Sequence, residues 1–277
     1  MFSSNLKGKV GIITGGTSGY GLESVYALQK KGANLAVFSI DEPSDDVLSK
    51  INECKEGKVS FYIADLMDEN AGKYIVEKTV ELYGSVDFVF ANAGFAIRYE
   101  KPILEYPTSE LLSGLKTQFQ IFPLSFLSLA VEAGKVMKSK YEAIEANKTG
   151  HKSDSGAIVV TLSEAVISNL RSDLLAYAAA KKSTQWIMES LAVSLARYNI
   201  RVNGIAPGFA NNEGQKKFYG MYPEILEDVE SLSHLKPSFM NPGSIVPLLE
   251  YLLTDNYVTG QTIALDGGYG LHTFSYF

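Results

Sequence analysis

Two residues four positions apart, Tyr177 and Lys181, are the clearest candidates for chemistry in this sequence. On a helix, residues at this spacing lie on one face, one turn from each other. A lysine ammonium held there favours the phenolate form of the tyrosine, so it should lower a pKa that is ordinarily about 10. Such a phenol can exchange protons at neutral pH as a general acid or base. The alternative is a half-buried Tyr177 beside a solvated Lys181.

A glycine cluster near the start of the chain is typical of phosphate binding. Gly15, Gly19 and Gly21 stand between an apolar run, 9–14, and an apolar-periodic stretch, 22–30, which is the pattern of a strand, a turn and a helix. Glycines there allow a tight turn and let a pyrophosphate approach the backbone N–H groups of a helix N-terminus. An ordinary turn also uses glycine, so the position at the first strand–helix junction is what favours binding.

The elements that position these residues alternate along the chain. Strands are expected at 9–14, 33–39, 59–64, 86–91, 157–162, 201–205 and 262–265, and helices at 22–30, 45–55, 71–83, 109–140 and from Tyr177 to about 198. Several strands are continuous apolar runs, which indicates a parallel sheet covered by helices on both faces. Without a break in composition or an internal repeat, we expect a single domain over 1–277.

Two long segments lie outside these elements. The polar stretch 138–154 is expected to be a surface extension between a helix and the next strand. The segment 209–242 follows a strand end and is rich in Tyr, Met, Phe and Leu. Long segments at that edge of an open sheet tend to cover the ligand, so this one is the expected determinant of substrate specificity. Packing of its aromatic side chains onto the body of the protein is the alternative.

Composition excludes several kinds of partner. A formal net charge of −6 without a Lys/Arg-rich run argues against nucleic-acid binding. The three histidines, His151, His234 and His272, are scattered, so no metal site is expected. Cys54 is the only cysteine, which favours a reducing compartment. Since neither a signal peptide nor a membrane-spanning apolar stretch is recognisable, we expect a cytoplasmic protein without a membrane partner.

Further motifs complete a family pattern. The glycine turn has the spacing TGxxxGxG, and it is followed in order by Asn92-Ala93-Gly94, Ser163, the pair Tyr177 and Lys181, Pro207-Gly208, Gly260-Gln261 and Asp266-Gly267-Gly268. Over nearly the whole chain, these motifs resemble the short-chain dehydrogenase/reductase family. The resemblance implies an α/β fold, a Rossmann-like doubly wound parallel sheet. It also implies hydride transfer between a nicotinamide cofactor and a carbonyl or secondary alcohol.

The resemblance also implies catalytic roles. Tyr177 would give or take the proton on the substrate oxygen, and Lys181 would lower the Tyr177 pKa and bind the nicotinamide ribose. Ser163 would hydrogen-bond the same oxygen, so that Ser163 and Tyr177 polarise an atom on which charge develops. The alternative for Ser163 is a strand-end serine that caps a turn. Gln118 stands where relatives usually have an asparagine that supports a proton relay through water.

Cofactor-binding positions follow from the same resemblance. They are Gly15, Thr17, Ser18, Gly19, Tyr20, Gly21, Ser39, Asp41, Asp65, Leu66, Asn92, Ala93, Gly94, Tyr177, Lys181, Pro207, Gly208, Ala210 and Asn212. Asp65 and Leu66 would contact the adenine ring, although Asp65 could instead cap the following helix. Tyr20 replaces the small aliphatic residue that is usual between the second and third glycines.

The end of the second strand bears on the choice between NAD and NADP. A ribose 2′-hydroxyl suits an acidic acceptor, whereas a 2′-phosphate needs a basic residue or another donor. The residues Ser39, Ile40, Asp41 and Glu42 include two carboxylates and no basic residue, which favours NAD. NADP stays open because Ser39 aligns with the usual acidic position and can donate to a phosphate. Asp41 and Glu42 could also be ordinary solvent-exposed residues of a loop.

The partner expected from the family is a small carbonyl or alcohol substrate, and the assembly a homodimer or homotetramer. The aromatic tail, 269–277, is a candidate for packing between copies. A non-catalytic NAD(P)-binding regulator of the same fold is the alternative function. Such proteins usually lose the catalytic tyrosine or lysine, and both are present here. A lyase or epimerase on this scaffold would typically carry a different glycine spacing and a longer C-terminal domain.

Overall fold

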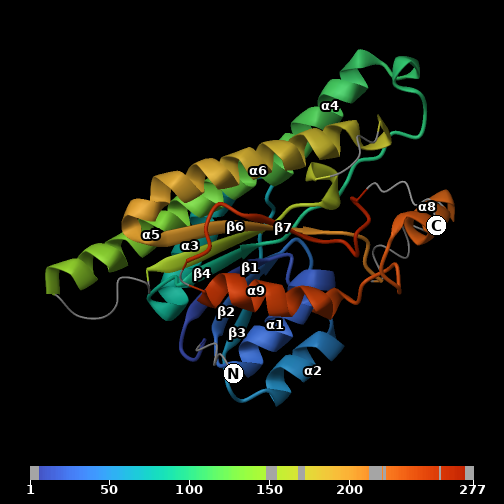
Figure 1. Ribbon diagram of the computed structural model, residues 1–277. Coiled ribbons are helices and arrows are strands. Elements are labelled where there is room, and N and C mark those ends of the chain that lie inside the picture. Colours follow the sequence, from blue (N-terminus) through green and yellow to red (C-terminus); the bar gives the residue numbers. More distant parts are fainter. Residues whose placement is uncertain are drawn as a thin grey trace.

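Seven parallel strands form one sheet in a computed structural model, which describes residues 6–147, 155–167, 172–211, 220, 223–255 and 257–271 (Figure 1). The strands are β1 (Val10–Thr14), β2 (Asn34–Ser39), β3 (Val59–Ile63), β4 (Phe88–Ala91), β5 (Gly156–Thr161), β6 (Ile200–Pro207) and β7 (Thr262–Leu265). Their order is β3-β2-β1-β4-β5-β6-β7. All seven strands expected from the sequence are therefore confirmed, with ends that differ by a few residues.

The parallel pairing brings the carboxyl ends of the strands to one edge of the sheet. In β1, Val10 pairs with Asn34 of β2 and Gly11 pairs with Phe88 of β4, so the chain runs outward from β1 in both directions. The strand order reverses between β1 and β4. In open parallel sheets, ligands bind beyond the carboxyl ends of the strands at such a reversal. This edge is therefore the place to look for a site.

Helices cover both faces, as a doubly wound sheet requires (Figure 1). The α-helices of the described chain are α1 (Gly19–Lys30), α2 (Asp45–Glu53), α3 (Ala71–Tyr83), α4 (Thr108–Phe119), α5 (Ser125–Asn147), α6 (Leu175–Leu195), α8 (Pro223–Leu232) and α9 (Val246–Thr254), of which α8 lies beyond the end of the sheet (Figure 1). Buried side chains of α1, α2 and α9 form the core under one face. Those of α3, α5 and α6 form the larger core under the other. The predicted α/β class and two-faced layering are confirmed.

One prediction about a helix was wrong, and two helices, α8 and α9, were not predicted. The stretch from Lys138 was expected to be a surface extension, but α5 continues through it to Asn147. Its Lys, Glu and Ala residues are good helix formers, and Lys138 forms an i,i+4 ion pair with Glu142 at 3.4 Å. Helix α9 was not predicted, since its near-uniform apolar sequence lacks the helical period. Leu249 and Leu252 of α9 are fully buried.

Helices α4 and α5 are joined end to end by η2 (Gln120–Leu124), a turn of π-helix. Pro123 lies inside it and has no N–H to donate to the preceding turn, which accounts for the irregularity. By length and composition, 108–146 is the one helical stretch among the described residues that could cross a membrane, but half of its most apolar part is buried. Burial of that kind is what a core helix shows.

Candidate active site

The glycine turn after β1 forms a surface that only glycine permits. Gly15 has φ +67°, and a Cβ there would lie 2.9 Å from the Ala93 Cα. A Cβ on Gly21 would lie 2.1 Å from the Gly15 carbonyl oxygen. Gly19, with φ +55°, begins α1. We call these three residues the glycine cradle. Its bare backbone at a helix N-terminus fits a dinucleotide pyrophosphate.

Neutral hydrogen bonds tie the cradle to the neighbouring strands. The Thr14 hydroxyl accepts from the Asn92 N–H at 3.0 Å and from the Ala93 N–H at 3.1 Å. The Asn92 amide donates to the Thr14 and Gly15 carbonyl oxygens, both at 3.3 Å, and accepts from the Thr161 hydroxyl at 3.0 Å. Lys181 Nζ then donates to the Thr161 carbonyl oxygen at 2.7 Å. A continuous chain of contacts therefore links the first strand to the expected catalytic lysine.

The end of β2 brings together Thr17 and Ser39, whose hydroxyl oxygens are 2.9 Å apart. Ser39 is buried, whereas Asp41 is exposed on the following loop. Of the two residues expected near adenine, Leu66 is buried and Asp65 is exposed.

The alternative that Asp65 caps the next helix is wrong. Asp65 Oδ1 accepts from the Met67 N–H at 2.9 Å in a local turn, and Asn70 is the residue that precedes α3. Residues 64–70 separate the end of β3 from the start of α3, so a cap at Asp65 would be too early.

The end of β6 lies close to the cradle. The Tyr20 hydroxyl donates to the Gly208 carbonyl oxygen at 3.3 Å, so the unusual tyrosine joins the first turn of α1 to the segment that follows β6. Pro207 and Ala210 are buried. The chain then pairs with a later segment, since the Asn211 N–H donates to the Met240 carbonyl oxygen at 2.9 Å. Of the expected cofactor-binding positions, Asn212 and no other lies outside the described residues.

Ser163, Glu164, Tyr177 and Lys181 meet beyond the end of β5, and we call them the polar cluster. The Ser163 hydroxyl donates to Glu164 Oε2 at 2.5 Å and accepts from the Ala165 N–H at 3.2 Å, so it also caps the 3₁₀ turn η4 (Glu164–Val166). The Tyr177 hydroxyl is hydrogen-bonded to Ser163. The cap proposed as an alternative role for Ser163 and its contact with Tyr177 thus coexist.

The two ionisable groups of the predicted pair titrate differently from expectation. Burial, followed by the nearby Glu164 carboxylate, raises the pKa of Tyr177. The expectation that Lys181 lowers this pKa is wrong here. Burial instead lowers the pKa of Lys181 itself to about 7, with the Glu164 charge acting in the opposite direction. Lys181 is 4% exposed, and the cost of removing its ammonium from water favours the neutral amine, which has no charge with which to lower the pKa of Tyr177.

Phe122 of η2 packs against α6 and against the segment that follows β4. Its ring lies 3.9 Å below Lys181 Nζ and meets the Tyr177 ring edge-on at 5.4 Å between centroids. A Cβ on Gly94 would lie 2.2 Å from the same ring, so the glycine there is needed for this close packing. The π turn therefore delivers an aromatic face to the buried ammonium.

Gln118 is fully buried beside this turn. Its Nε2 donates to the Phe95 carbonyl oxygen at 3.0 Å, and its Oε1 accepts from the Ile97 N–H at 3.4 Å. Both ends of the amide thus hold the segment that follows β4, which gives Gln118 a structural role in place of a free amide.

Sequence reasoning missed four residues of this edge: Thr14, Phe122, Thr161 and Glu164. An acidic residue directly after the expected polarising serine was a signal for Glu164, and hydroxyls at two strand ends were a weaker one. Nothing in the sequence marked Phe122. No group of three or more His, Cys, Asp or Glu side chains in the described chain is arranged to hold a metal ion.

The sequence is similar to known oxidoreductases over nearly its whole length. Residues 15–270 match a family model described as enoyl-(acyl carrier protein) reductase. An uncharacterised oxidoreductase of Thermotoga maritima is 30% identical over 267 residues, covering 95% of this chain and 96% of that protein. Short-chain dehydrogenase reductase 3b of Arabidopsis thaliana is 30% identical over 276 residues, covering 98% and 99%.

A solved structure matches over the same span. The NADPH-dependent 3-quinuclidinone reductase of Rhodotorula rubra superposes with a TM-score of 0.80 at 25% identity, covering 96% of this chain and 93% of that one. The agreement extends over the sheet and both helical layers, so it covers all the elements that carry the glycine cradle and the polar cluster.

Proposed function

Because the chain belongs to the short-chain dehydrogenase/reductase family, we propose that it transfers a hydride between NAD(P) and the carbonyl or secondary alcohol of a small molecule. The observation that carries the proposal is the meeting of Ser163, Tyr177 and Lys181 beside the glycine cradle. Hydrogen-bonded hydroxyls next to a site that fits a pyrophosphate are what carbonyl reduction or alcohol oxidation needs.

In this proposal the chain supplies protons and geometry, and a bound nicotinamide supplies or accepts the hydride. A raised pKa keeps Tyr177 protonated at neutral pH, so its hydroxyl carries a proton that a substrate oxygen can accept. Ser163 fixes the position of that hydroxyl. Lys181, held by Thr161 at 2.7 Å, places an ammonium one helical turn away, where a ribose hydroxyl can accept from it.

For the cofactor, we propose NAD in preference to NADP. Asp41 and Glu42 are exposed carboxylates beyond β2, and the Ser39 hydroxyl lies 2.9 Å from that of Thr17. A dianionic 2′-phosphate would meet two negative charges there. The solved relative described above depends on NADPH. Parallel fluorescence titrations with NADH and NADPH decide the matter, and tighter binding of NADPH would overturn the preference.

The segment 209–242 is proposed to cover the substrate. Helix α8 packs on the end of β6 through a small core in which Phe209 stacks edge-on against Tyr269 at 5.1 Å and Phe239 at 6.5 Å between centroids. Phe209 and Phe239, the described aromatic residues of this segment, therefore serve packing, which was the alternative role. The wall they form holds α8 over the carboxyl edge, where a substrate would enter.

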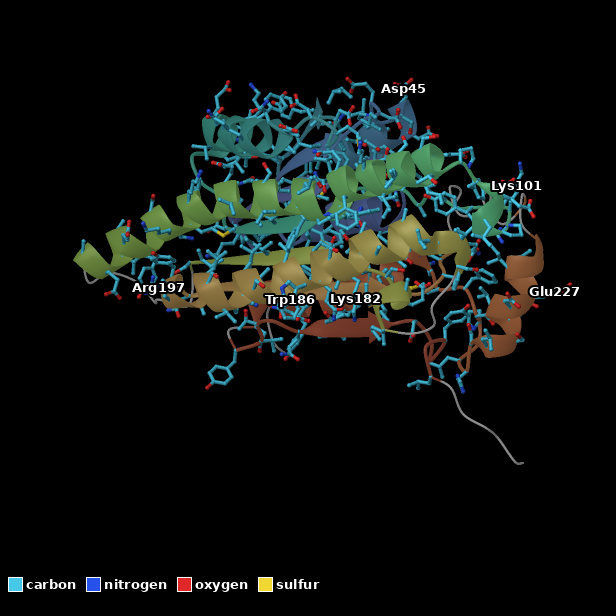
Figure 2. All side chains as sticks on the ribbon, turned by 90° about the horizontal axis from the view of Figure 1, so that it is seen from above. Asp45, Lys101, Lys182, Trp186, Arg197 and Glu227 are labelled. Carbon is cyan, nitrogen blue, oxygen red and sulfur yellow. The ribbon has the colours of Figure 1, made fainter. Side chains whose placement is uncertain are left out.

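Assembly as a homodimer or homotetramer is also proposed, in the cytoplasm and with neither nucleic acid nor membrane as a partner. Figure 2 shows α5 and α6 side by side, with Lys182 and Trp186 on the outer side of α6. The Trp186 side chain is 72% exposed and Val193 is 81% exposed. Apolar residues of this kind on long helices fit contacts between copies. Tyr269, once a candidate for such contacts, is buried within its own chain, and 272–277 lie outside the described residues.

The test of the proposed function is the Tyr177→Phe variant. Removing the hydroxyl removes the proton donor, so turnover of a substrate found by screening ketones and alcohols should fall by about 10³-fold. Cofactor affinity should be unchanged. Tyr257→Phe, at a fully exposed position, is the matched control. Turnover that survives in Tyr177→Phe would refute the assignment.

A further inference from the structure

Glu164 is a buried carboxylate inside the proposed active site, and no motif of the sequence includes it. Glu164 is 7% exposed, and its Oε2 atom lies 2.5 Å from the Ser163 hydroxyl oxygen. Charge-assisted O–H···O⁻ bonds have this length and are about twice as strong as neutral ones. A bond of this strength governs where the Ser163 hydrogen points.

The hydrogen-bonding capacity of Ser163 is then full. A hydroxyl has one hydrogen to donate and two lone pairs to accept with. Ser163 donates its hydrogen to Glu164 and accepts from the Ala165 N–H. Its contact with Tyr177 must therefore be one in which the tyrosine donates. Tyr177, Ser163 and Glu164 thus form a chain in which each hydroxyl hydrogen points toward the carboxylate.

The surroundings of Glu164 are defined by η4 and the elements packed on it, α6 and β6. The described titratable groups that face it come from α6. They are Tyr177 and Lys181, each within electrostatic range, and Lys182, whose Nζ donates to the Val166 carbonyl oxygen at 2.8 Å. The residues of β6, Ile200–Pro207, add Arg201 at the far end of the strand, where it binds the carbonyl oxygens that end α9.

We propose that Glu164 is a positioning residue of this site: its carboxylate orients the Ser163 hydroxyl, and its charge sets the pH range in which Tyr177 and Lys181 exchange protons. The inference rests on the proposed function, because it assigns Glu164 a role relative to Tyr177 as proton donor. While the carboxylate holds the Ser163 hydrogen, Ser163 has none to give a substrate oxygen. The Tyr177 hydrogen is held by a neutral hydroxyl and can turn to a substrate oxygen, whereas the Ser163 hydrogen is held by the stronger bond to the carboxylate.

The charge has a defined sign of effect. A carboxylate favours the protonated form of any neighbour, and Glu164 raises the pKa of both Tyr177 and Lys181. Replacing it by a neutral group should lower both values. Glu164→Gln does this while keeping an oxygen that can accept from Ser163. Glu164→Asp does the opposite, because it keeps the charge and shortens the reach by one methylene.

The first readout needs neither cofactor nor substrate. The titration of Lys181 is followed by NMR in lysine-labelled protein, with the resonance assigned from a Lys181→Met variant. Glu164→Gln should lower the pKa of Lys181 by about 1, whereas Glu164→Asp should leave it near the parent value of about 7. Glu189→Gln, which removes one charge from the same helix away from the site, is the matched control and should change nothing.

The second readout is the pH profile of turnover. In Glu164→Gln the profile should move to lower pH by a similar amount, and in Glu164→Asp it should stay in place. An unchanged Lys181 titration and profile in Glu164→Gln, with Tyr177→Phe inactive, would overturn this inference alone. An equal displacement in Glu164→Asp would overturn it too, because charge would not be the cause. Activity in Tyr177→Phe would instead refute the proposed function.

Discussion

The glycine cradle and the polar cluster lie at the same edge of the sheet, but different forces build them. Around β1 and β4, the shape is set by missing Cβ atoms and by hydrogen bonds among neutral hydroxyl, amide and backbone groups. Around β5 and α6, buried groups that can carry charge perturb one another. Binding at the glycine cradle should therefore depend on side-chain volume and not on pH. Proton exchange in the polar cluster should depend on pH and not on side-chain volume.

The largest effect is expected from adding volume to the cradle. In Gly21→Val, the new side chain would overlap the Gly15 carbonyl oxygen, because even a Cβ comes to 2.1 Å. The turn must move, so NADH affinity should fall by about 100-fold or more. Fluorescence titration at pH 6 and pH 9 should give the same loss. Gly134→Ala, where a Cβ makes only ordinary contact with Leu195, should bind normally. Full NADH affinity in Gly21→Val would show that the cradle is not the binding surface.

The next effect concerns the buried ammonium. Between pH 7 and 10.5 the unfolded chain holds a proton on Lys181 that the folded chain lacks, so stability should rise with pH across this window. Below it, the folded state carries a desolvated charge. Lys181→Met should therefore raise the free energy of unfolding at pH 7 by about 2 kcal/mol and flatten its dependence on pH. Urea unfolding from pH 6 to 10 measures both, with Lys182→Met as the exposed control. A slope as steep as in the parent chain would contradict the assignment.

A third variant carries a charge into the neutral half. Asn92→Asp loses the amide that donates to the Thr14 and Gly15 carbonyl oxygens and places a carboxylate beside the cradle. NADH affinity should fall by about tenfold at neutral pH and recover in part at acid pH, as the new carboxyl is protonated. Titrations at several pH values test this, against the exposed Asn52→Asp. A loss that does not depend on pH would mean that geometry alone is responsible.

The smallest effect is expected at the exposed end of β2. The double variant Asp41→Asn, Glu42→Gln removes two solvated carboxylates, so NADPH should bind about threefold more tightly relative to NADH. The gain should shrink when salt is added, because these charges are screened. Asp45→Asn with Asp46→Asn, at the start of α2, is the control for net charge. An unchanged preference would place the cofactor's ribose away from this loop.

The same contrast explains which features of the structure could be predicted from the sequence. The seven strands and the glycine cradle were predictable, since apolar runs and obligatory glycines are local features of the chain. The meeting of Ser163 with Tyr177 followed from the order of the motifs. Glu164 and Phe122 were not predicted. The burial of Glu164 and the π turn that carries Phe122 depend on how α4, α5 and α6 pack. The direction of the pKa change at Tyr177 was wrong for that reason, because desolvation is a property of the folded chain.

The π turn between α4 and α5 has a consequence for changes of chain length. An α-helix advances about 100° per residue, and η2 holds an extra residue within its turn. The wider turn takes up that residue with little rotation of α4 against α5, so deleting one residue there, such as Leu124, would make the helix continuous and leave both flanks in place. Gln118 would then keep its hold on the segment that follows β4, whereas a further inserted residue would rotate α4 relative to α5 by about 100°. Deletions and insertions at this point therefore have unequal consequences for the surroundings of the site.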